Sequence, residues 1–257
     1  MATATTFRNF TGEVILPGDA AYDRNRAVWN GVIDRRPAAV LRCASAEDVV
    51  AAVRCAREAD LEIAVKCGGH NAAGLSVTDG GVMIDLSPMS HVGIDPRRRK
   101  AWAGGGSLLG NLDRAAQHHG LATTAGNVSH TGVGGLTLGG GMGWLARQFG
   151  LACDNVEAYT VVTAEGCMVR ATATENPDLF WGVRGGGGNF GIVTEFEFRL
   201  HPVTGGALLV ELVFDAADAR NPLRAWRDML AGAPRQATLI ASATTSEKRP
   251  VVSVGYV

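Results

Sequence analysis

A glycine-rich stretch from Ala125 to Gly143 is the part of the sequence whose residue types most clearly indicate chemistry. Seven glycines fall between Gly132 and Gly143, which is too dense for an ordinary helix or strand because each glycine costs backbone entropy. Such a run makes sense where backbone N–H groups must approach a ligand closely, and phosphate is the commonest ligand of this kind. Further glycine loops lie at Cys67–Asn71 and Gly185–Gly188. Three loops predict a long ligand held at several points.

His70 is the side chain in these loops that is best placed for chemistry, because it stands between a glycine and an asparagine. Small neighbours leave its imidazole free to face a ligand, whereas the alternative is a loop histidine that only hydrogen-bonds the backbone. The residues alone leave both interpretations open. His130 lies within the long glycine stretch and could also approach the ligand. His91 and His201 border turns, where we expect solvated side chains.

Two common nucleotide-binding patterns are excluded. Gly141–Ala146 and Gly186–Gly191 both fit the pattern GxGxxG/A. In a Rossmann unit that pattern needs a strand before it, a helix after it and an acidic residue about twenty positions further on. The first match follows more glycine and the second runs into a strand, so we exclude NAD(P) binding. No GxxxxGK[ST] phosphate loop occurs.

Alternating strands and helices deliver the chain to these loops. A strand at Ala38–Leu41, a helix over about Ala46–Ala59 with Ser45 as its N-cap, and a strand at Leu61–Val65 predict a β–α–β unit. This unit ends in the loop that carries His70.

Later segments predict an antiparallel arrangement. Ser107 is expected to cap another helix, and Val156–Thr163 with Cys167–Thr172 predicts a β-hairpin. A composition break at Gly205–Gly206 precedes a strand, a helix over about Ala217–Leu230 and two more strand-like runs.

The composition argues against several classes of partner. The chain has 257 residues and a net charge of −1, which gives no reason to expect nucleic acid or an anionic membrane. No apolar run reaches membrane-spanning length, and the N-terminus does not read as a signal peptide. The five cysteines contain no CxxC pair, so neither a disulfide framework nor a metal site is indicated. We expect a cytoplasmic protein.

Four motifs in this order resemble one family. They are Val65–Asn71, Gly132–Gly143, Gly150–Asn155 and Asn176–Thr194. Together they are similar to the berberine-bridge-enzyme-like FAD-linked oxidases, which carry the vanillyl-alcohol-oxidase or PCMH type of FAD-binding domain. The resemblance implies an α+β fold: a lead-in (1–35), a PCMH-type FAD-binding domain of two α+β subdomains (36–203), and the incomplete start of an antiparallel-sheet substrate domain (204–257).

The resemblance also implies how FAD is held. The His70 loop and the central glycine stretch would bind the pyrophosphate through backbone N–H groups, and Arg184–Val193 would support the adenosine side. His70 would be bonded covalently to the flavin 8α-methyl group, which retains the cofactor and makes it a stronger oxidant. The residues assigned to the cofactor are Cys67, Gly68, Gly69, His70, Asn71, Gly126, Gly132, Gly134, Gly135, Thr137, Leu138, Gly139, Gly140, Gly141, Gly143, Gly191, Ile192 and Val193.

The sequence departs from the family at several positions. Many members carry a second flavin link through a cysteine four residues before Gly132, where this chain has Val128. A cysteinyl link is therefore excluded. Cys67 is given no covalent role, and Lys66 stands where relatives often have an arginine, so it offers charge without bidentate geometry.

No catalytic residue is assigned. In the family, the substrate domain continues further and the chain then returns with a tyrosine-type base. Tyr22 and Tyr159 are expected to pack in the fold, and Tyr256 lies on the last predicted strand. The catalytic base is therefore expected outside these residues.

The resemblance implies an FAD-dependent oxidoreductase of the oxidase type. A C–H bearing oxygen or nitrogen would lose a hydride to flavin N5, and dioxygen would reoxidise the flavin. The implied substrates are small molecules: sugars, secondary-metabolite alcohols or alkaloid-like amines. Two alternatives stay open, a flavin-binding module without turnover of its own and a dehydrogenase that uses another acceptor. The oligomeric state is not predicted.

Overall fold

The computed structural model describes residues 7, 10–203 and 206–257. Most of the first ten residues of the predicted lead-in and the predicted boundary at Thr204 therefore lie outside the described residues, as does Gly205 of the composition break. The fold is α+β with several separate sheets, which confirms the predicted class. No helix in the described ranges is long and apolar enough to cross a membrane.

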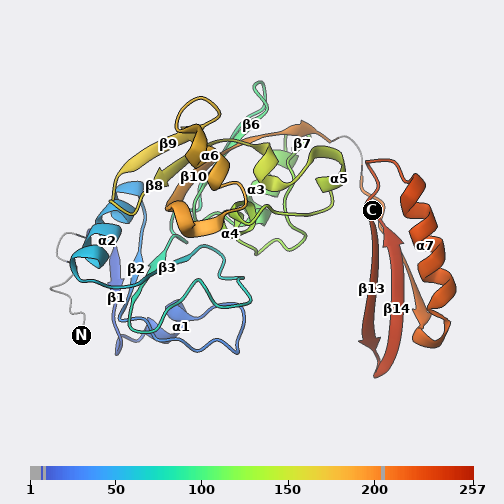
Figure 1. The fold of residues 1–257 in the computed structure, drawn as a ribbon, viewed down its shortest axis with the longest axis horizontal. Helices are drawn as coiled ribbons and strands as arrows, with labels where there is room; N and C mark the ends of the chain where they lie inside the picture. The colour runs from blue at the N-terminus through green and yellow to red at the C-terminus, as the bar shows by residue number, and fades with distance from the viewer. Residues whose placement is uncertain (1–6, 8–9, 204–205) are drawn as a thin grey trace.

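The first subdomain is built on a four-stranded sheet flanked by two helices (Figure 1). The strand order is β1–β2–β4–β3, with β1 antiparallel to β2 and the other pairs parallel. The elements are β1 (Glu13–Ile15), α1 (Tyr22–Arg26), β2 (Ala39–Arg42), α2 (Ala46–Glu58), β3 (Ile63–Lys66) and β4 (Val82–Asp85). The predicted β–α–β unit is thus β2–α2–β3, with β4 inserted between its two strands.

Alternation along β2 and β4 builds two cores, one on each face of this sheet. Leu41 and Ile84 belong to the core that includes α2 residues, whereas Val40 and Met83 belong to the core that includes Tyr22 of α1. Successive strand residues point to opposite faces, so strands that are apolar at every position are covered on both sides.

Helix α2 begins where the sequence predicts. The Ser45 hydroxyl accepts a hydrogen bond from the backbone N–H of Asp48 at 3.1 Å, and the Asp48 carboxylate accepts one from the Ser45 N–H at 3.1 Å. This reciprocal capping box satisfies two N–H groups that the first turn of a helix leaves without partners.

The second subdomain is a five-stranded antiparallel sheet in the order β5–β6–β10–β8–β9. Its core includes Tyr159, Phe196 and Phe198, which the sheet packs against Leu109 and Leu112 of helix α3. The predicted hairpin is confirmed as β8–β9. The elements are β5 (Val92–Asp95), β6 (Lys100–Gly104), α3 (Leu109–Gln117), β7 (Leu121–Ala122), α4 (Val133–Leu138), α5 (Ala146–Phe149), η2 (Ala152–Asn155), β8 (Val156–Val162), β9 (Met168–Thr172), α6 (Pro177–Gly182), η3 (Gly187–Phe190), β10 (Ile192–Arg199) and β11 (His201–Pro202).

Two local predictions in this subdomain are wrong. Ser107 does not cap α3; its hydroxyl donates to the His91 carbonyl at 2.9 Å, and the N-cap position is Leu108. His201 is not a solvated turn residue. It lies on β11, stacks on Phe149 with ring centroids 4.0 Å apart, and its Nε2 lies 2.7 Å from Asn155 Oδ1. In both cases a partner distant in sequence replaces the local one.

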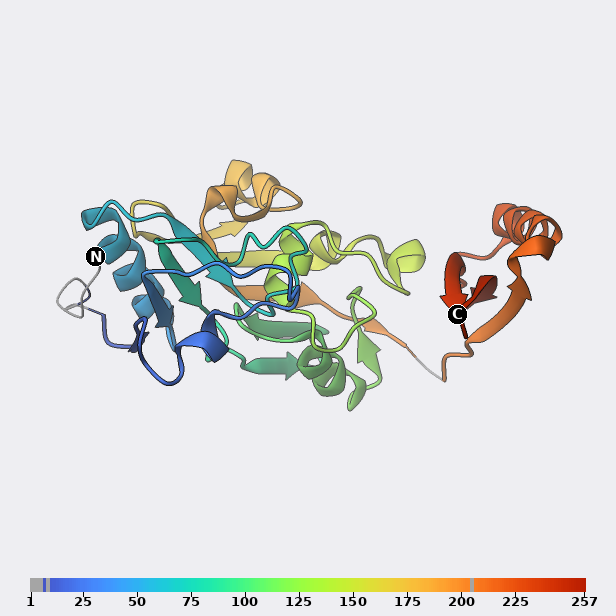
Figure 2. The same cartoon turned by 90° about the horizontal axis from the view of Figure 1, so that it is seen from below.

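The last fifth of the chain forms a separate three-stranded sheet with one long helix (Figures 1 and 2). The final strand, β14, lies between β12 and β13 and is antiparallel to both. Helix α7 carries no buried residue, and Leu212 and Met229 are more than half exposed. The elements are β12 (Val210–Asp215), η4 (Ala216–Asp218), α7 (Arg220–Gly232), β13 (Leu239–Ser246) and β14 (Arg249–Tyr256).

Side chain to backbone hydrogen bonds connect this unit to the region around α5. Arg147 donates to the carbonyl oxygens of Ala233, at 3.1 Å, and Ala237. In return, Arg235 donates to the Arg147 carbonyl at 2.8 Å, and the Thr238 hydroxyl donates to the carbonyl of Trp144 at 2.7 Å.

Candidate functional site

A cavity of about 650 Å³ opens where the three glycine loops meet, at the end of β3 and the start of β10. A volume of this order is typical of a small-molecule or cofactor site. It is lined by Ile63, Ala64, Val65, Cys67, Gly68, Gly69, His70, Asn71, Leu75, Ser76, Leu86, Gly105, Thr131, Gly132, Gly134, Gly135, Leu136, Leu138, Gly139, Gly187, Gly188, Asn189, Gly191, Ile192 and Val193.

Most of the residues that the sequence assigns to the cofactor line this one cavity. They are Cys67, Gly68, Gly69, His70, Asn71, Gly132, Gly134, Gly135, Leu138, Gly139, Gly191, Ile192 and Val193. Five others do not line it: Gly126, Thr137, Gly140, Gly141 and Gly143. Thr137 is buried in α4, and the space that a Cβ on Gly143 would need is filled by the Ala125 carbonyl. Thr137 and Gly143 therefore belong to the packing of the glycine stretch and not to the cavity lining.

Several lining residues were not assigned from the sequence. Ile63 and Ala64 could have been found, since β3 delivers the chain into the His70 loop. Ser76 lies further along the segment between β3 and β4, Leu86 directly follows β4, and neither carries a local signal. The glycine stretch also contains a short helix, α4, where the density of glycine argued against any helix. Its six residues are held by Val133 and Thr137, which are buried and anchor the turn against the fold.

The His70 loop and the central glycine stretch interlock backbone to backbone. A Cβ on Gly68 would lie 2.4 Å from the Gly132 nitrogen, and a Cβ on Gly132 would lie 2.4 Å from Cys67 Sγ. Neither glycine can therefore carry a side chain without moving the other loop. This contact brings residues about sixty positions apart in sequence onto the same rim of the cavity.

Cys67 lines the cavity at this junction, and its side chain is partly buried. Its thiol donates to the Ser107 carbonyl at 3.4 Å, and burial raises its pKa, an effect that the backbone N–H groups of Gly134 and Gly68 partly oppose. A protonated, internally bonded thiol is a poor nucleophile. That Cys67 has no covalent role stays a prediction.

Two imidazoles meet at the rim. His70 Nε2 lies 2.7 Å from His130 Nδ1, and the ring centroids are 4.7 Å apart with the planes tilted by 38°. Trp29 stacks on His70, with centroids 5.2 Å apart and an interplanar angle of 19°. Burial and the neighbouring His130 lower the pKa of the His70 imidazole below its usual value. Both effects favour the neutral imidazole over the charged one, and the His70 ring contacts the rings of Trp29 and His130.

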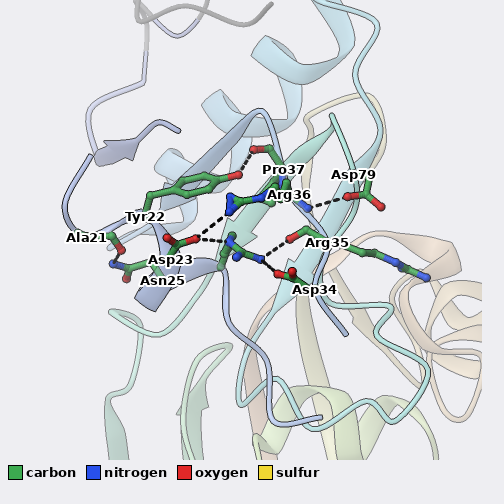
Figure 3. Close-up of polar contacts among 10 residues, drawn as sticks. Ala21, Tyr22, Asp23, Asn25, Asp34, Arg35, Arg36, Pro37 and Asp79 are labelled. Carbon is green, nitrogen blue, oxygen red and sulfur yellow. Dashed lines mark hydrogen bonds and ion pairs between the residues drawn. The ribbon is translucent and has the colours of Figure 1, made fainter. Parts of the chain in front are cut away.

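The segment that carries Trp29 is fixed by a polar network (Figure 3). The Arg26 guanidinium donates to Asp23 at 2.7 Å and also to Asp34, while the Tyr22 hydroxyl donates to the Pro37 carbonyl at 2.6 Å. The backbone N–H of Trp29 donates to the Gly69 carbonyl at 3.0 Å. This network ties the lead-in to the His70 loop, and it was not predicted from the sequence.

The lining is neutral and dominated by backbone. Ten of its 25 residues are glycines, and His70 is the one titratable ring; no Asp, Glu, Lys or Arg is among the described residues that form it. A Cβ on Gly135, Gly187 or Gly188 would meet nothing within 4 Å, so backbone there borders open space. Backbone N–H groups and not cations would meet a phosphate in such a site.

Ser76 provides a further indication that a polar ligand belongs here. Its hydroxyl is buried and finds no hydrogen-bond partner among the described residues, although the residue lines the cavity. An unpaired buried hydroxyl costs about 1–3 kcal/mol, so such groups usually have a partner. A ligand with hydroxyl or phosphate groups fits this atom. Fold and site together define an α+β protein whose glycine loops form a cavity suited to a phosphate-bearing ligand.

Comparisons with known proteins identify the family to which the chain belongs. A family model described as an FAD binding domain matches residues 37–172, more than half of the chain. The (R)-6-hydroxynicotine oxidase of Paenarthrobacter nicotinovorans is 44% identical over 190 residues, covering 74% of this chain and 42% of that protein. The structure of 6-hydroxy-D-nicotine oxidase from Arthrobacter nicotinovorans matches with a TM-score of 0.94 at 36% identity, covering 99% of this chain and 57% of that one.

A second solved structure extends the likeness. Physcomitrella patens BBE-like 1 matches with a TM-score of 0.91 at 27% identity, covering 100% of this chain and 56% of that one. The chain belongs to the family of FAD-linked oxidoreductases with a PCMH-type FAD-binding domain, which includes the berberine-bridge-enzyme-like proteins, as its motifs predict. It spans about half the length of the curated relatives it matches.

Proposed function

We propose that this chain binds FAD in the cavity and forms the cofactor-binding part of an oxidase that removes a hydride from a small molecule. The observation that carries the proposal is the convergence of three glycine loops on one neutral cavity with His70 at its rim. The family to which the chain belongs supports the choice of FAD over other dinucleotides.

The residues divide the work of holding the cofactor. Backbone N–H groups of the His70 loop and the central glycine stretch that border the cavity would receive the pyrophosphate, and the backbone at Gly188 would border the adenosine side. The Ser76 hydroxyl would bond a polar group of the ligand. Ile63 and Ile192 give the cavity apolar walls that exclude water from a flat ring. When bound, FAD supplies hydride acceptance and electron transfer to dioxygen.

We further propose that His70 attaches FAD covalently and that no cysteinyl link forms, since Val128 offers no thiol. Acid precipitation of the purified chain should give a yellow pellet whose mass is increased by one FAD. The variant His70→Ala should release its flavin into the supernatant while still binding it before acid treatment. Complete release of flavin from the unmodified chain would refute the covalent link and leave FAD binding intact.

The substrate is proposed as a small molecule with a C–H next to oxygen or nitrogen. The relative at 44% identity is named a hydroxynicotine oxidase, which makes cyclic amines the first class to test, followed by sugars and secondary-metabolite alcohols. Anaerobic addition of each should bleach the flavin absorbance, and readmission of air should restore it with hydrogen peroxide as product. Slow recovery in air with fast reduction of an artificial acceptor would indicate a dehydrogenase.

A flavin-binding module without turnover is the second candidate. It is favoured by the tyrosines of the chain: Tyr22 and Tyr159 are buried, as predicted, and burial raises the pKa of both hydroxyls, which keeps them protonated and unable to accept a proton. Tyr256 lies on β14, in the separate C-terminal unit. A yellow chain that no substrate class bleaches would support this candidate over the oxidase.

A further inference from the structure

The contact between His70 and His130 has a chemical consequence. We propose that His130 is the positioning residue for covalent attachment at His70: its Nδ1 accepts the Nε2–H of His70 and leaves Nδ1 of His70 as the nitrogen that bonds the flavin. This inference rests on the proposed function, because it concerns how His70 is prepared for FAD.

The 2.7 Å separation admits two tautomeric arrangements. A neutral imidazole carries one N–H and one lone pair. If His70 Nε2 donates, its Nδ1 keeps a lone pair that can form a bond. If His130 Nδ1 donates instead, His70 carries its proton on Nδ1 and has no free lone pair. His130 therefore selects the reactive form when it acts as acceptor, with its own proton on Nε2.

His130 is placed by backbone hydrogen bonds on both sides. Gly110 N–H donates to the Ser129 carbonyl at 2.8 Å, and Leu109 N–H donates to the Thr131 carbonyl at 2.9 Å. These bonds tie the loop to the start of helix α3. The imidazole of His130 is exposed, yet its Cα cannot drift away from His70 without breaking one of them. A positioning role needs a fixed partner of this kind.

Trp29 completes the alignment from the lead-in. Its ring lies nearly parallel to that of His70, at 19°, while the hydrogen bond from Trp29 N–H to the Gly69 carbonyl fixes its backbone. Stacking limits rotation of the His70 ring about its side-chain torsions. The ring therefore keeps its Nε2 toward His130.

Attachment joins His70 Nδ1 to the 8α carbon of FAD and breaks one C–H bond of that methyl group, whose proton passes to solvent. Bond formation would leave His70 as a cation, so its Nε2 proton passes to His130 Nδ1 and from there to solvent. Two electrons pass to the flavin and then, with two protons, to dioxygen, which becomes hydrogen peroxide.

The test follows attachment directly and does not depend on turnover. The full chain, prepared without flavin, is incubated with FAD in air, and the fraction bound covalently is measured over time by acid precipitation and mass. In His130→Ala the rate should fall about 10- to 100-fold, as when hydrogen-bond partners of functional histidines are removed. In His130→Asn, whose side-chain oxygen can occupy the place of Nδ1, most of the rate should return. Added imidazole should also accelerate His130→Ala.

A matched control separates this role from general loss of structure. His119→Ala removes another exposed histidine, beyond the end of α3, and should attach FAD at the unmodified rate. Non-covalent affinity for FAD should be alike in all variants before attachment. Equal attachment rates in His130→Ala and the unmodified chain would overturn the inference alone. Absence of covalent flavin in the unmodified chain would instead overturn the proposed link at His70.

Discussion

Gly132 and Gly135 lie three residues apart in one glycine stretch, yet they face different surroundings. A Cβ on Gly132 would collide with Cys67 Sγ at 2.4 Å and Gly68 N at 2.5 Å, whereas a Cβ on Gly135 would meet nothing within 4 Å. The missing side chain at Gly132 lets two loops of the protein touch. The missing side chain at Gly135 leaves space beside the cavity. Similar residues thus have one role in folding and another in ligand binding, and the two roles predict opposite effects of substitution.

The largest effect is expected from Gly132→Ala. Its new methyl group must displace backbone of the neighbouring loop, and overpacking of this kind costs about 1–3 kcal/mol. The Tm of the flavin-free chain should fall by roughly 2–12 °C, at about 2–4 °C per kcal/mol for a protein of this size. Gly93→Ala is the matched control, because a Cβ there meets nothing within 4 Å. If both variants unfold at the same temperature, the interlock of the two loops is refuted.

Gly135→Ala should separate binding from stability. Gly135 lies inside α4, where alanine is favoured over glycine by about 1 kcal/mol, so the Tm of the flavin-free chain should stay constant or rise. The same methyl group occupies space beside the cavity, and non-covalent FAD affinity should fall about tenfold, measured by flavin fluorescence titration. Unchanged affinity would show that this part of the lining does not touch FAD.

Ser76→Ala should also weaken FAD binding, by less than Gly135→Ala does. The hydroxyl has no partner among the described residues, so its removal should leave the stability of the flavin-free chain unchanged or slightly raised. Loss of one hydrogen bond to the ligand should weaken FAD binding about fivefold, within the usual 0.5–1.5 kcal/mol of such a bond. A lower Tm without any change in affinity would place the hydroxyl outside the binding site.

The smallest expected effect is the one on stability from His201, which does not line the cavity, whereas His70 does. Burial, with the charges of Arg199 and Arg99, lowers the pKa of His201 in the fold. The neutral ring is then preferred, so its contribution to stability is present above the ordinary pKa and is lost as pH falls below it. Between about pH 7.5 and pH 5.5, the Tm of the unmodified chain should fall by a degree or two more than that of His201→Gln. Flavin attachment should not differ between the two.

The sequence predicted features that depend on neighbouring residues. The capping box at Ser45 and Asp48 and the β8–β9 hairpin follow from local hydrogen bonding and alternation, and both are present. The convergence of the glycine loops was also predicted, because glycine density is itself a local signal. Features that depend on distant partners were missed or mistaken. Ser107 bonds His91 in place of capping a helix, and the contact of Trp29 with His70 depends on a network around Arg26.

Side chains from both regions donate hydrogen bonds across the junction between α5 and the C-terminal sheet. In each of the four bonds among the described residues, the acceptor is a main-chain carbonyl oxygen. A carbonyl is present whatever side chain the residue carries. Ala233, Ala237 and Trp144 can therefore change identity without removing an acceptor, provided the backbone keeps its course. Among the residues that the structure describes, the donors Arg147, Arg235 and Thr238 are the side chains on which these hydrogen bonds depend. Such a joint lets the surface beyond it diversify through evolution while the attachment to the cofactor-binding half is preserved.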